Sequence, residues 1–511
     1  MNFNPNDLVG VLPAILLAVG GCVLMTTEVF LRLPVGGAAP DRRYQAFLAA
    51  AFAALGLWAA LAQLGDPVQS IFSGAAVSDG FGRIVAATVC ASLVLSCLLA
   101  FGYLESLSAT RGEFYALALF SAAGMCLLAQ ATDLIVIFIA LEVMSLAVYC
   151  LTAYLRRGKR PSEAAFKYFI LGSFASAIFL YGAALGFGAT GSTRLVDLAN
   201  GIQRVAANSP GTPPGMAMLL WASVALLTVG FGFKVAAVPF HMWLPDVYDG
   251  APAPVTGFMA AGVKAAGFAT LVRILVVGFG DPSAAMGPHG WQTLIAWLAV
   301  LTMLVGNLLA VPQRSVKRML AYSSIAHAGY LLVAVAAMGA SSARGDALQG
   351  LLFYLASYGA TVIGAFGVVA LIERKLQSAG ATDDLSSWAG LSEEHPVLAA
   401  AMALFMVSLA GVPPTAGFMS KLFVFRAAIS ADLVPLAIFG VLTSVAGLYY
   451  YLRVVVYVYM VPQAKSDPIV GGRTLSAGLA LAGCALLIFW LGVQPGAFAT
   501  LAQTAVQGFG R

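Results

Sequence analysis

Apolar runs of roughly 20 residues recur along the whole chain, and each is long enough to cross the hydrocarbon core of a bilayer. Hydrophobic residues make up 60% of the 511 positions and charged residues 10%. A soluble domain carries about one quarter charged residues. Because the runs are continuously apolar rather than alternating, they favour helices over the strands of a membrane barrel. The sequence therefore predicts an all-α integral membrane protein.

Fourteen membrane-spanning helices are predicted. We expect them to begin near residues 8, 44, 80, 113, 132, 163, 216, 254, 291, 316, 347, 397, 433 and 474. The start of the chain lacks the basic segment of a cleaved signal, so the first run is expected to remain as a span. The six cysteines lie in apolar runs without CxxC spacing, which predicts buried hydrophobic groups rather than metal ligands or disulfides.

Basic residues in the connections predict the orientation. The connections after odd-numbered spans hold fifteen of them: Arg32, Arg42, Arg43, Arg111, Arg156, Arg157, Lys159, Arg160, Arg314, Lys317, Arg318, Arg374, Lys375, Lys465 and Arg473. The opposite connections hold six: Arg83, Arg194, Arg204, Arg344, Arg426 and Arg511. Because positive residues favour the cytoplasm, we expect both termini on the periplasmic side of a bacterial inner membrane. The RRGKR cluster at 156–160 is equally suited to anchoring lipid headgroups, which gives the same orientation.

The remaining charges lie inside predicted spans, where a charge is costly and usually functional. They are Glu142, Lys167, Lys234, Lys264, Arg273, Lys421 and Arg453. Glu142 has apolar neighbours on both sides, so a functional acid is favoured over a structural ion-pair partner. Lys234 precedes Pro239 and Pro245, and Lys421 follows Pro413 and Pro414. These prolines predict broken helices at spans 7 and 12, and a lysine beside a broken helix is typical of an ion-handling site.

Other ionisable groups leave two interpretations open. Lys264 lies near the middle of its span, whereas Lys167 lies about one turn inside and is able to reach the headgroups instead. His327 is able to relay protons or to be a hydrogen-bonded packing residue, and His241 beside the first break is equally ambiguous. Arg273 and Arg453 lie closer to span ends, which favours headgroup anchoring. His289 and His395 are expected in loops.

The two predicted breaks are five spans apart, which suggests two five-helix units of opposite topology, spans 4–8 and 9–13. This gives spans 1–3 in residues 1–110, a first repeat in 111–280, a second repeat in 285–462, and a last span in 470–511. Burial lowers the pKa of a lysine and raises that of a glutamate, and a nearby opposite charge reverses both effects. A row of such groups is therefore able to pass protons by changing the charge that each neighbour experiences.

The stretch FKVAAVPFHMWLPDVYDGAPAPVTGFMAAGVKAAGF (233–268) resembles the proton-translocating antiporter-like membrane family. This family contains the large hydrophobic subunits of respiratory complex I and of multisubunit cation/proton antiporters. Within it, DVYDGAPAPV, the LEVMSLAVYCL segment around Glu142, the 25-residue step to Lys167 and GFMSK ending at Lys421 resemble the N-type subunits of NADH–quinone oxidoreductase. The resemblance covers about residues 10 to 500.

The resemblance implies a fourteen-helix fold with inverted repeats and proton movement driven by quinone reduction elsewhere in a complex. It implies that Glu142 and Lys234 form the key pair, that Lys264 is the central relay, and that Lys421 serves the outer half-channel. Lys167 would be a modulating charge. The implied neighbours are subunits M and L and the small subunits A, J and K, together with lipids but no nucleic acid. Quinone, FMN and iron–sulfur clusters would be bound elsewhere, and this chain shows no GxGxxG motif or cysteine ligand set for a cofactor or metal.

Two other functions remain open. A subunit of a multisubunit Na⁺(K⁺)/H⁺ antiporter would have similar spans and lysines, although the DVYDGAPAPV variant and the lack of a long carboxy-terminal extension argue against it. A structural membrane subunit would have charges that only pair with one another. This structural alternative is disfavoured, because it gives no function to several buried ionisable residues and two broken spans.

Overall fold

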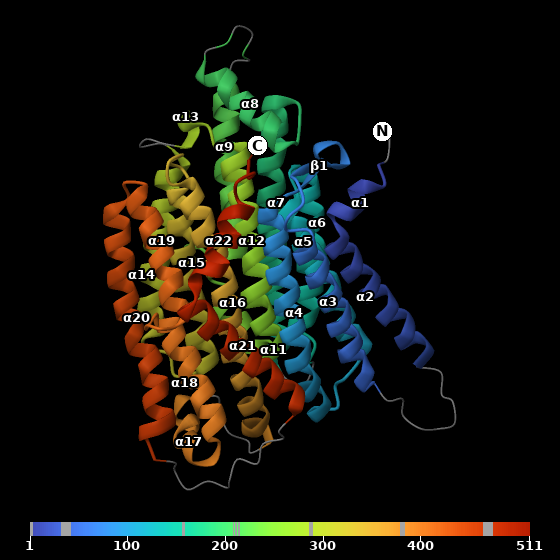
Figure 1. The fold of residues 1–511 in the computed structure, drawn as a ribbon, viewed down its shortest axis with the longest axis vertical. Coiled ribbons are helices and arrows are strands. Elements are labelled where there is room, and N and C mark those ends of the chain that lie inside the picture. Colours follow the sequence, from blue (N-terminus) through green and yellow to red (C-terminus); the bar gives the residue numbers. More distant parts are fainter. Residues whose placement is uncertain are drawn as a thin grey trace.

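The computed structural model describes residues 4–31, 42–155, 159–207, 209, 212, 215–285, 290–378, 384–462 and 474–510. Figure 1 shows an elongated bundle of helices that run along one direction. Five of the basic residues predicted in the connections after odd-numbered spans lie outside the described residues: Arg32, Arg156, Arg157, Lys465 and Arg473. His289 lies outside them as well. The bundle itself confirms the all-α membrane fold.

Thirteen described segments are helical, long and apolar enough to cross a membrane. They are α2 (Leu12–Leu31), α3 (Arg43–Ala62), α4 (Gly80–Ser106), α5 (Gly112–Gln130), α6 (Leu134–Thr152), α7 (Lys159–Thr190), α9 (Met216–Val235), the continuous segment α11 to η3, α14 (Trp291–Ala310), α15 (Val316–Ala337), α16 (Arg344–Ser378), α20 (Val434–Met460) and α21 (Leu475–Val493). The predicted span near residue 397 is divided into α18 (Pro396–Ala410) and α19 (Ala416–Ser430). With this divided span included, the count agrees with the predicted fourteen.

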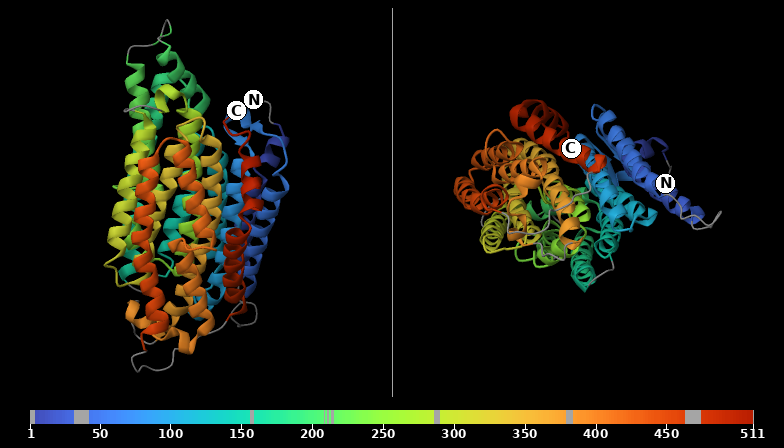
Figure 2. Two further views of the ribbon diagram at one scale, coloured as in Figure 1. Left: turned by 60° about the vertical axis from the view of Figure 1, so that its left-hand side comes forward. Right: turned by 90° about the horizontal axis from the view of Figure 1, so that it is seen from below.

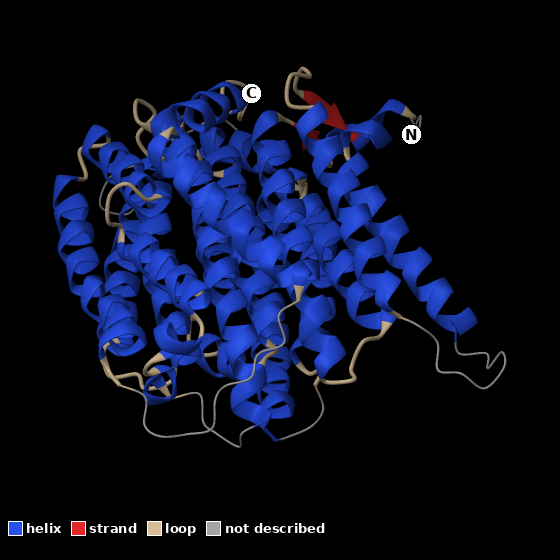
Figure 3. Cartoon of the chain, turned by 60° about the horizontal axis from the view of Figure 1, so that its bottom comes forward, coloured by secondary structure: helices blue, strands red, loops and turns tan. Residues whose placement is uncertain are grey.

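Short elements connect or cap the spans. They are α1 (Asn6–Gly10), β1 (Gln69–Ile71), η1 (Phe72–Gly74), β2 (Ala76–Ser78), α8 (Leu195–Ala206), α10 (Leu244–Gly250), α13 (Pro282–Ala285), η4 (Leu385–Trp388), α17 (Leu391–Glu394) and α22 (Pro495–Ala505). The sequence did not predict the β1–β2 hairpin, which pairs Gln69 with Ser78 outside the spans. Figure 3 shows these two strands near the amino terminus. The hairpin is three residues per strand, too short for periodicity to reveal.

Both termini lie at the same end of the bundle, together with α8 (Figures 1 and 2). An even number of crossings requires this placement. In the view along the bundle, α2 and α3 lie at one end of the long cross-section and α14 and α20 at the other (Figure 2). The segment from α11 to η3, α15 and α16 are the most enclosed spans, so they form the centre.

Both predicted helix breaks are present. Helix α9 ends at Val235, where Ala236 adopts a left-handed conformation with φ 59°, and α10 begins eight residues later at Leu244. Helix α18 ends at Ala410, where Gly411 has φ 85°, and α19 begins at Ala416. A left-handed residue ends a helix because its N–H turns back to the last carbonyls. Each break therefore interrupts a span at membrane depth, as the prolines predict.

The central span changes its helical form on both sides of Lys264. Helix α11 (Ala253–Phe258) continues into the π-helical segment η2 (Met259–Val263), then α12 (Lys264–Arg273), then the π-helical segment η3 (Ile274–Gly278). π-Helical turns are rare and occur mostly at functional sites. Lys264 is thus the first residue after a widened turn.

The predicted headgroup anchoring of Arg273 is wrong. Its side chain is 1% exposed and makes two hydrogen bonds of 2.9 and 2.8 Å with the carboxylate of Asp79. Its Nε donates to the carbonyl of Ala129. The rings of Phe81 and Phe509, which contact one another, lie 5.5 and 5.2 Å from the guanidinium carbon. The partner lies 194 positions away in sequence, so no local pattern reveals the pair. This ion pair joins the central span to α4 and to the carboxy-terminal segment.

We expect Arg273→Met to destabilise the protein by about 3–5 kcal/mol, because it leaves the Asp79 carboxylate buried without its counter-ion. The measurement is thermal unfolding of the detergent-solubilised protein. Arg194→Met is the matched control, since Arg194 is 52% exposed in its ion pair with Asp197. Removing an exposed pair costs about 1 kcal/mol or less. Equal melting temperatures for the two variants would show that the Arg273–Asp79 pair adds no stability.

Candidate functional site

Lys234 and Glu142 lie near the same face of α6. The Lys234 Nζ, in the last turn of α9, donates to Ser145 Oγ at 2.8 Å and to Tyr149 OH at 3.1 Å. Glu142 precedes Ser145 by three positions and therefore lies on that face. Its Oε1 accepts a hydrogen bond of 2.6 Å from the hydroxyl of Ser176 on α7. The two predicted partners are thus neighbours through Ser145, but the described residues include no direct ion pair between them.

The first break leaves backbone groups that other side chains satisfy. The Trp243 Nε1 donates to the carbonyl of Phe233 at 3.0 Å, and the Val238 N–H donates to Thr302 Oγ1 at 2.9 Å. Thr302 belongs to α14 and lies 64 positions from Val238 in the sequence. This hydrogen bond therefore connects the break with the second half of the molecule. Irregular backbone at membrane depth is tolerated only where protein or water meets it.

Lys264 is 2% exposed and is held by α15. Its Nζ donates to Ser324 Oγ at 2.6 Å and also to the carbonyl of Ser324. The Tyr358 hydroxyl of α16 donates to the same Ser324 Oγ, and the Lys264 Nζ lies 5.3 Å from the centre of the Tyr358 ring. One turn after Lys264, a Cβ placed at Gly267 would lie 3.8 Å from the Cβ of Lys234. The absence of a side chain at Gly267 therefore brings the helices of the two lysines together.

His327 lies within a cluster of tyrosines between Lys264 and Lys421. Its Nδ1 is 2.7 Å from Tyr354 OH and its Nε2 is 3.0 Å from Tyr451 OH. The ring of Tyr358, which contacts Lys264, lies 4.9 Å from the imidazole, centre to centre. The ring of Tyr330 lies 5.7 Å away on another side. His327 is therefore hydrogen-bonded at both nitrogens, which satisfies the packing interpretation and also connects it to neighbouring hydroxyls.

Lys421 closes the second break. Its Nζ donates to the carbonyls of Leu409 and Ala410 at 3.0 and 2.8 Å, which are the last two residues of α18, and to Ser444 Oγ at 2.8 Å. The same ammonium lies 5.3 Å from the centre of the Tyr330 ring. A cation at a helix carboxyl terminus is stabilised by the helix dipole. The lysine thus satisfies carbonyls that the break exposes.

A shared feature of Lys234, Lys264 and Lys421 is that hydroxyls, carbonyls and aromatic rings surround them. Among the described residues, none of these three ammonium groups forms an ion pair with a carboxylate. Taking an unpaired charge out of water costs several kcal/mol. The hydrogen-bond partners of each of these three lysines are therefore neutral groups.

Lys167 differs from the other lysines. Its side chain is 41% exposed and pairs with Glu163 at 2.7 Å and with Asp246 of α10 at 2.9 Å. Asp246 also pairs with Arg318 of α15 at 3.0 Å. Lys167 therefore belongs to a surface ion-pair network at the end of the bundle opposite the termini, and it is not brought to the buried row.

The other sequence candidates have local roles. Arg453 donates to the carbonyls of Val311 and Gln313 after α14, consistent with a place at a span end. His241 lies within the first break, and its Nδ1 is buried without a hydrogen-bond partner. His395 precedes α18, as expected for a loop residue. None of the three contacts the lysine row through a described hydrogen bond.

Sequence reasoning missed the hydroxyl and amide groups that hold the row. Asn307 donates to Tyr330 OH at 3.1 Å and accepts from Tyr450 OH at 3.0 Å. The segment AYSSIAHAGY places Ser323, Ser324, His327 and Tyr330 at helical spacings of three and four. This spacing is a usable signal for a polar stripe on one helix. The spacing of residues in the sequence does not show which side chains of α6, α16 and α20 contact the row.

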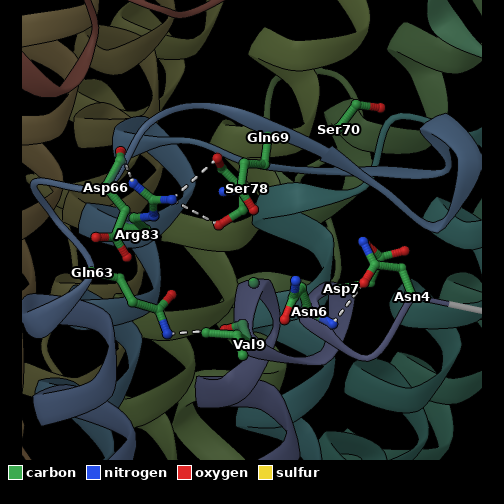
Figure 4. Close-up of a pocket in the computed structure, with 11 residues that line it drawn as sticks. Asn4, Asn6, Asp7, Val9, Gln63, Asp66, Gln69, Ser70, Ser78 and Arg83 are labelled. Atoms are coloured by element: carbon green, nitrogen blue, oxygen red, sulfur yellow. Dashed lines mark hydrogen bonds between the residues drawn. The ribbon is translucent and has the colours of Figure 1, made fainter.

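A separate polar cavity of about 510 Å³ lies at the end that holds the termini (Figure 4). Asp7, Gln63 and Arg83 line it, and Arg83 donates from its guanidinium to the backbone oxygens of Asp66, Pro67 and Ser78. Arg83 is 3% exposed, so it is a buried residue of α4 rather than the loop charge expected from sequence. Across the described part of the chain, no group of three or more His, Cys, Asp or Glu is arranged to hold a metal.

Comparisons with known proteins agree on one family. The family described as "NADH:quinone oxidoreductase/Mrp antiporter, TM" matches residues 131–447. "NADH-quinone oxidoreductase subunit N" of Myxococcus xanthus is 46% identical over 100% of this chain and 99% of its own. Subunit N of Rhodospirillum rubrum is 38% identical over 96% of each chain.

Solved structures match over nearly the whole chain. A chain of respiratory complex I from Thermus thermophilus is 34% identical with a TM-score of 0.77, covering 96% of this chain and 99% of that one. A chain of the Mrp complex from Dietzia is 21% identical with a TM-score of 0.80, covering 99% and 97%. The second similarity concerns the fold alone.

We expect Thr302→Val to destabilise the protein by about 1–3 kcal/mol, because it leaves the buried Val238 N–H without an acceptor. Thr302→Ser should retain the stability, since it keeps the hydroxyl. Thr504→Val serves as the control, because Thr504 is exposed and bonds only within α22 and its end. The readout is thermal unfolding in detergent. If Thr302→Val melts together with Thr302→Ser, the proposed support of the break by α14 is wrong.

Proposed function

Because this chain belongs to the NADH:quinone oxidoreductase/Mrp antiporter transmembrane family, we propose that Glu142, Lys234, Lys264, His327 and Lys421 form its path for protons. The chain is an antiporter-like membrane subunit of NADH–quinone oxidoreductase, of the subunit N type. Its function is to translocate protons across the membrane in response to quinone reduction elsewhere in the complex. Lys167 is assigned a modulating role at the surface.

One observation carries the assignment of the path. Lys234, Lys264 and Lys421 are buried and follow one another in a row. The helices of Lys234 and Lys264 pack together at Gly267, and aromatic rings around His327 connect Lys264 with Lys421. Among the described residues, none of the three has a carboxylate counter-ion. A structural subunit whose charges only pair with one another would show the opposite arrangement. Arg273 with Asp79 is the structural kind of pair in this same molecule.

Proton transfer along the row follows from these contacts. A proton that arrives at Glu142 neutralises its carboxylate and removes a negative charge from the neighbourhood of Lys234. The Lys234 ammonium is then less stabilised and releases its proton inward, toward Lys264. A positive charge on Lys264 in turn opposes a second one near His327 and Lys421, which favours release from Lys421. Water molecules between the residues carry each proton over the gaps.

The breaks define two units that we propose to be inverted repeats, residues 111–280 and 285–462, between spans 1–3 in 1–110 and the last span in 470–511. The support is that α9 and α18 both end in a left-handed residue, and each break adjoins a buried lysine. Spans 7 and 12 run in opposite directions, because they are an odd number of crossings apart. A site at the interface of such repeats lies near the midplane.

The surroundings of the chain are also part of the proposal. It assembles with the other membrane subunits, M and L and the small subunits A, J and K, in a bacterial inner membrane, and it contacts lipid along its exposed apolar faces. It binds no quinone, flavin, cluster or metal itself and has no redox centre. The energy for transport therefore comes from other subunits, and this chain supplies the path.

A subunit of a multisubunit Na⁺(K⁺)/H⁺ antiporter is the alternative. It would have the same fold, and the matching Mrp chain is 21% identical. The alternative is less well supported, since the identity to subunit N chains is about twice as high over the whole length.

We expect Lys234→Ala and Glu142→Gln to abolish proton pumping coupled to quinone reduction and to lower the redox rate. The first removes the proton-carrying amine, and the second keeps the shape of the acid but not its charge. Both are measured in inverted membrane vesicles with NADH and quinone. Arg453→Ala should have a mild effect, because Arg453 donates its hydrogen bonds to the carbonyls of Val311 and Gln313 and has no described hydrogen bond to the lysine row.

Purification of the variants in mild detergent tests whether the NADH–quinone reductase partners remain bound. If the wild-type chain purifies without these partners, it does not function in that complex. If Lys234→Ala pumps normally in an intact complex, the assignment of the path is wrong.

Both termini are proposed to face the periplasm. Alkaline phosphatase fused after the last residue should be active, because this enzyme matures only outside the cytoplasm, whereas a green fluorescent protein fused there through the general secretion route should be dark. A fusion truncated after Tyr154, at the opposite end, serves as the control with the reverse result. Activity of phosphatase at Tyr154 alone would reverse the orientation.

A further inference from the structure

A second lysine–glutamate pair lies at the end of the bundle opposite the termini. Lys317 is the second residue of α15, and its Nζ is 3.1 Å from Glu373 Oε1 of α16. The Tyr103 hydroxyl of α4 donates to the other carboxylate oxygen at 3.2 Å. The Lys317 Nζ also donates to the carbonyl of Ala251, where α10 ends, at 2.9 Å. The predicted position of Lys317 in a loop is wrong, because the residue lies in α15 and its side chain is 3% exposed.

This pair lies on the elements that surround Lys264. Ser324, which holds Lys264, follows Lys317 by two helical turns on α15, or about 10 Å along the axis. Tyr358, which shares Ser324, belongs to the same helix as Glu373. Ala251 directly precedes the span that carries Lys264. The pair and Lys264 therefore lie one above the other within the same group of helices.

The pair has one partly accessible member. The Glu373 side chain is 15% exposed and the Lys317 side chain 3%, so the carboxylate is closer to the surface and the ammonium is closer to the interior. The ion pair of Arg273 and Asp79, at the opposite end of the Lys264 span, differs from this pair, because its side chains are only 1% and 2% exposed. A guanidinium does not release its proton in proteins, whereas an ammonium is able to. Of these two buried pairs, the Lys317–Glu373 pair is the one with the chemistry of a proton carrier.

We propose that Glu373 and Lys317 form an entrance through which protons reach Lys264 from the end of the bundle opposite the termini. This inference rests on the proposed function of Lys264 as a proton relay. It adds a second source of protons for Lys264 beside Glu142 and Lys234, and both sources are required because each changes the charge that Lys264 experiences. Tyr103 orients the carboxylate, and the Ala251 carbonyl orients the ammonium.

The transfer balances in two steps. The Lys317 ammonium gives a proton through water toward an unprotonated Lys264 and becomes a neutral amine. Glu373 takes a proton from the aqueous phase and passes it to that amine, so the pair returns to its carboxylate and ammonium forms. One proton has then entered, and no other species is consumed. The hydroxyl of Thr256, on the helix between Ala251 and Lys264, is buried and available as an intermediate acceptor.

The test uses the intact complex in membrane vesicles, with proton pumping and quinone reduction measured together. Glu373→Gln keeps the shape and one acceptor oxygen for Lys317 but carries no proton, so we expect both rates to fall by about tenfold or more. Glu373→Asp should retain most of the activity. Glu105→Gln is the matched control with unchanged rates, because Glu105 is a 38% exposed carboxylate at the same end of α4, paired with the exposed Arg43.

A double variant separates proton transfer from structure. Glu373→Gln with Lys317→Met leaves no unpaired buried charge, so a purely structural pair would be relieved and the activity would recover. Our proposal expects the loss to persist in an assembled complex. Recovery in the double variant, or normal pumping by Glu373→Gln, overturns the entrance. If Glu373→Gln does not assemble, the double variant decides alone.

Failure of the entrance is distinguishable from failure of the proposed function. Lys264→Met in the same vesicles should stop pumping whether or not the entrance exists. Normal pumping by Lys264→Met overturns the path itself, whereas loss in Lys264→Met with normal pumping in Glu373→Gln overturns the entrance alone.

Discussion

Hydroxyl and carbonyl oxygens hold the three buried lysines of the row, and the arrangement of the bundle depends on supplying them. Lys234, Lys264 and Lys421 each need two or three acceptors at membrane depth, where water is scarce. A carboxylate partner would fix the proton firmly. Neutral acceptors satisfy the hydrogen bonds while leaving the charge uncompensated, so proton affinity stays sensitive to the neighbouring charges. Ser145 and Ser324 therefore belong to the proposed path as much as the lysines do.

The broken helices follow from the same need. An intact helix uses all its carbonyls internally, and a break at α18 releases those of Leu409 and Ala410 for Lys421. At the break after α9, the carbonyl of Phe233 accepts from Trp243 and the N–H of Val238 donates to Thr302. Lys234 there donates to hydroxyls of α6 rather than to released carbonyls. The two breaks thus have the same backbone form but different partners. A break without such partners would be costly in lipid.

The sequence predicts what is local and leaves out what is distant. Runs of apolar residues predict the spans, prolines predict both breaks, and an interrupted apolar run reveals a buried lysine. The contacts of those lysines come from other spans, such as Tyr149 for Lys234, and no spacing relates them. The same limit hid the partner of Arg273, whose position near a span end suggested a headgroup anchor. The predicted loop position of Lys317 is wrong because a charged residue in the first turn of a helix is not distinguishable by sequence from one in the preceding loop.

Two buried ion pairs lie near opposite ends of the span that carries Lys264, and they differ in whether the basic partner is able to release a proton. Arg273 with Asp79 fixes one end of the Lys264 span to α4. Lys317 with Glu373 fixes the other end to α15 and α16, and Tyr103 extends that contact to α4. Between these two contacts the span contains the π-helical segment η2, and the second π-helical segment, η3, begins directly after Arg273. Lys264 therefore follows a π-helical segment in a span that contacts one buried ion pair through Arg273 and the other through the carbonyl of Ala251 just before it.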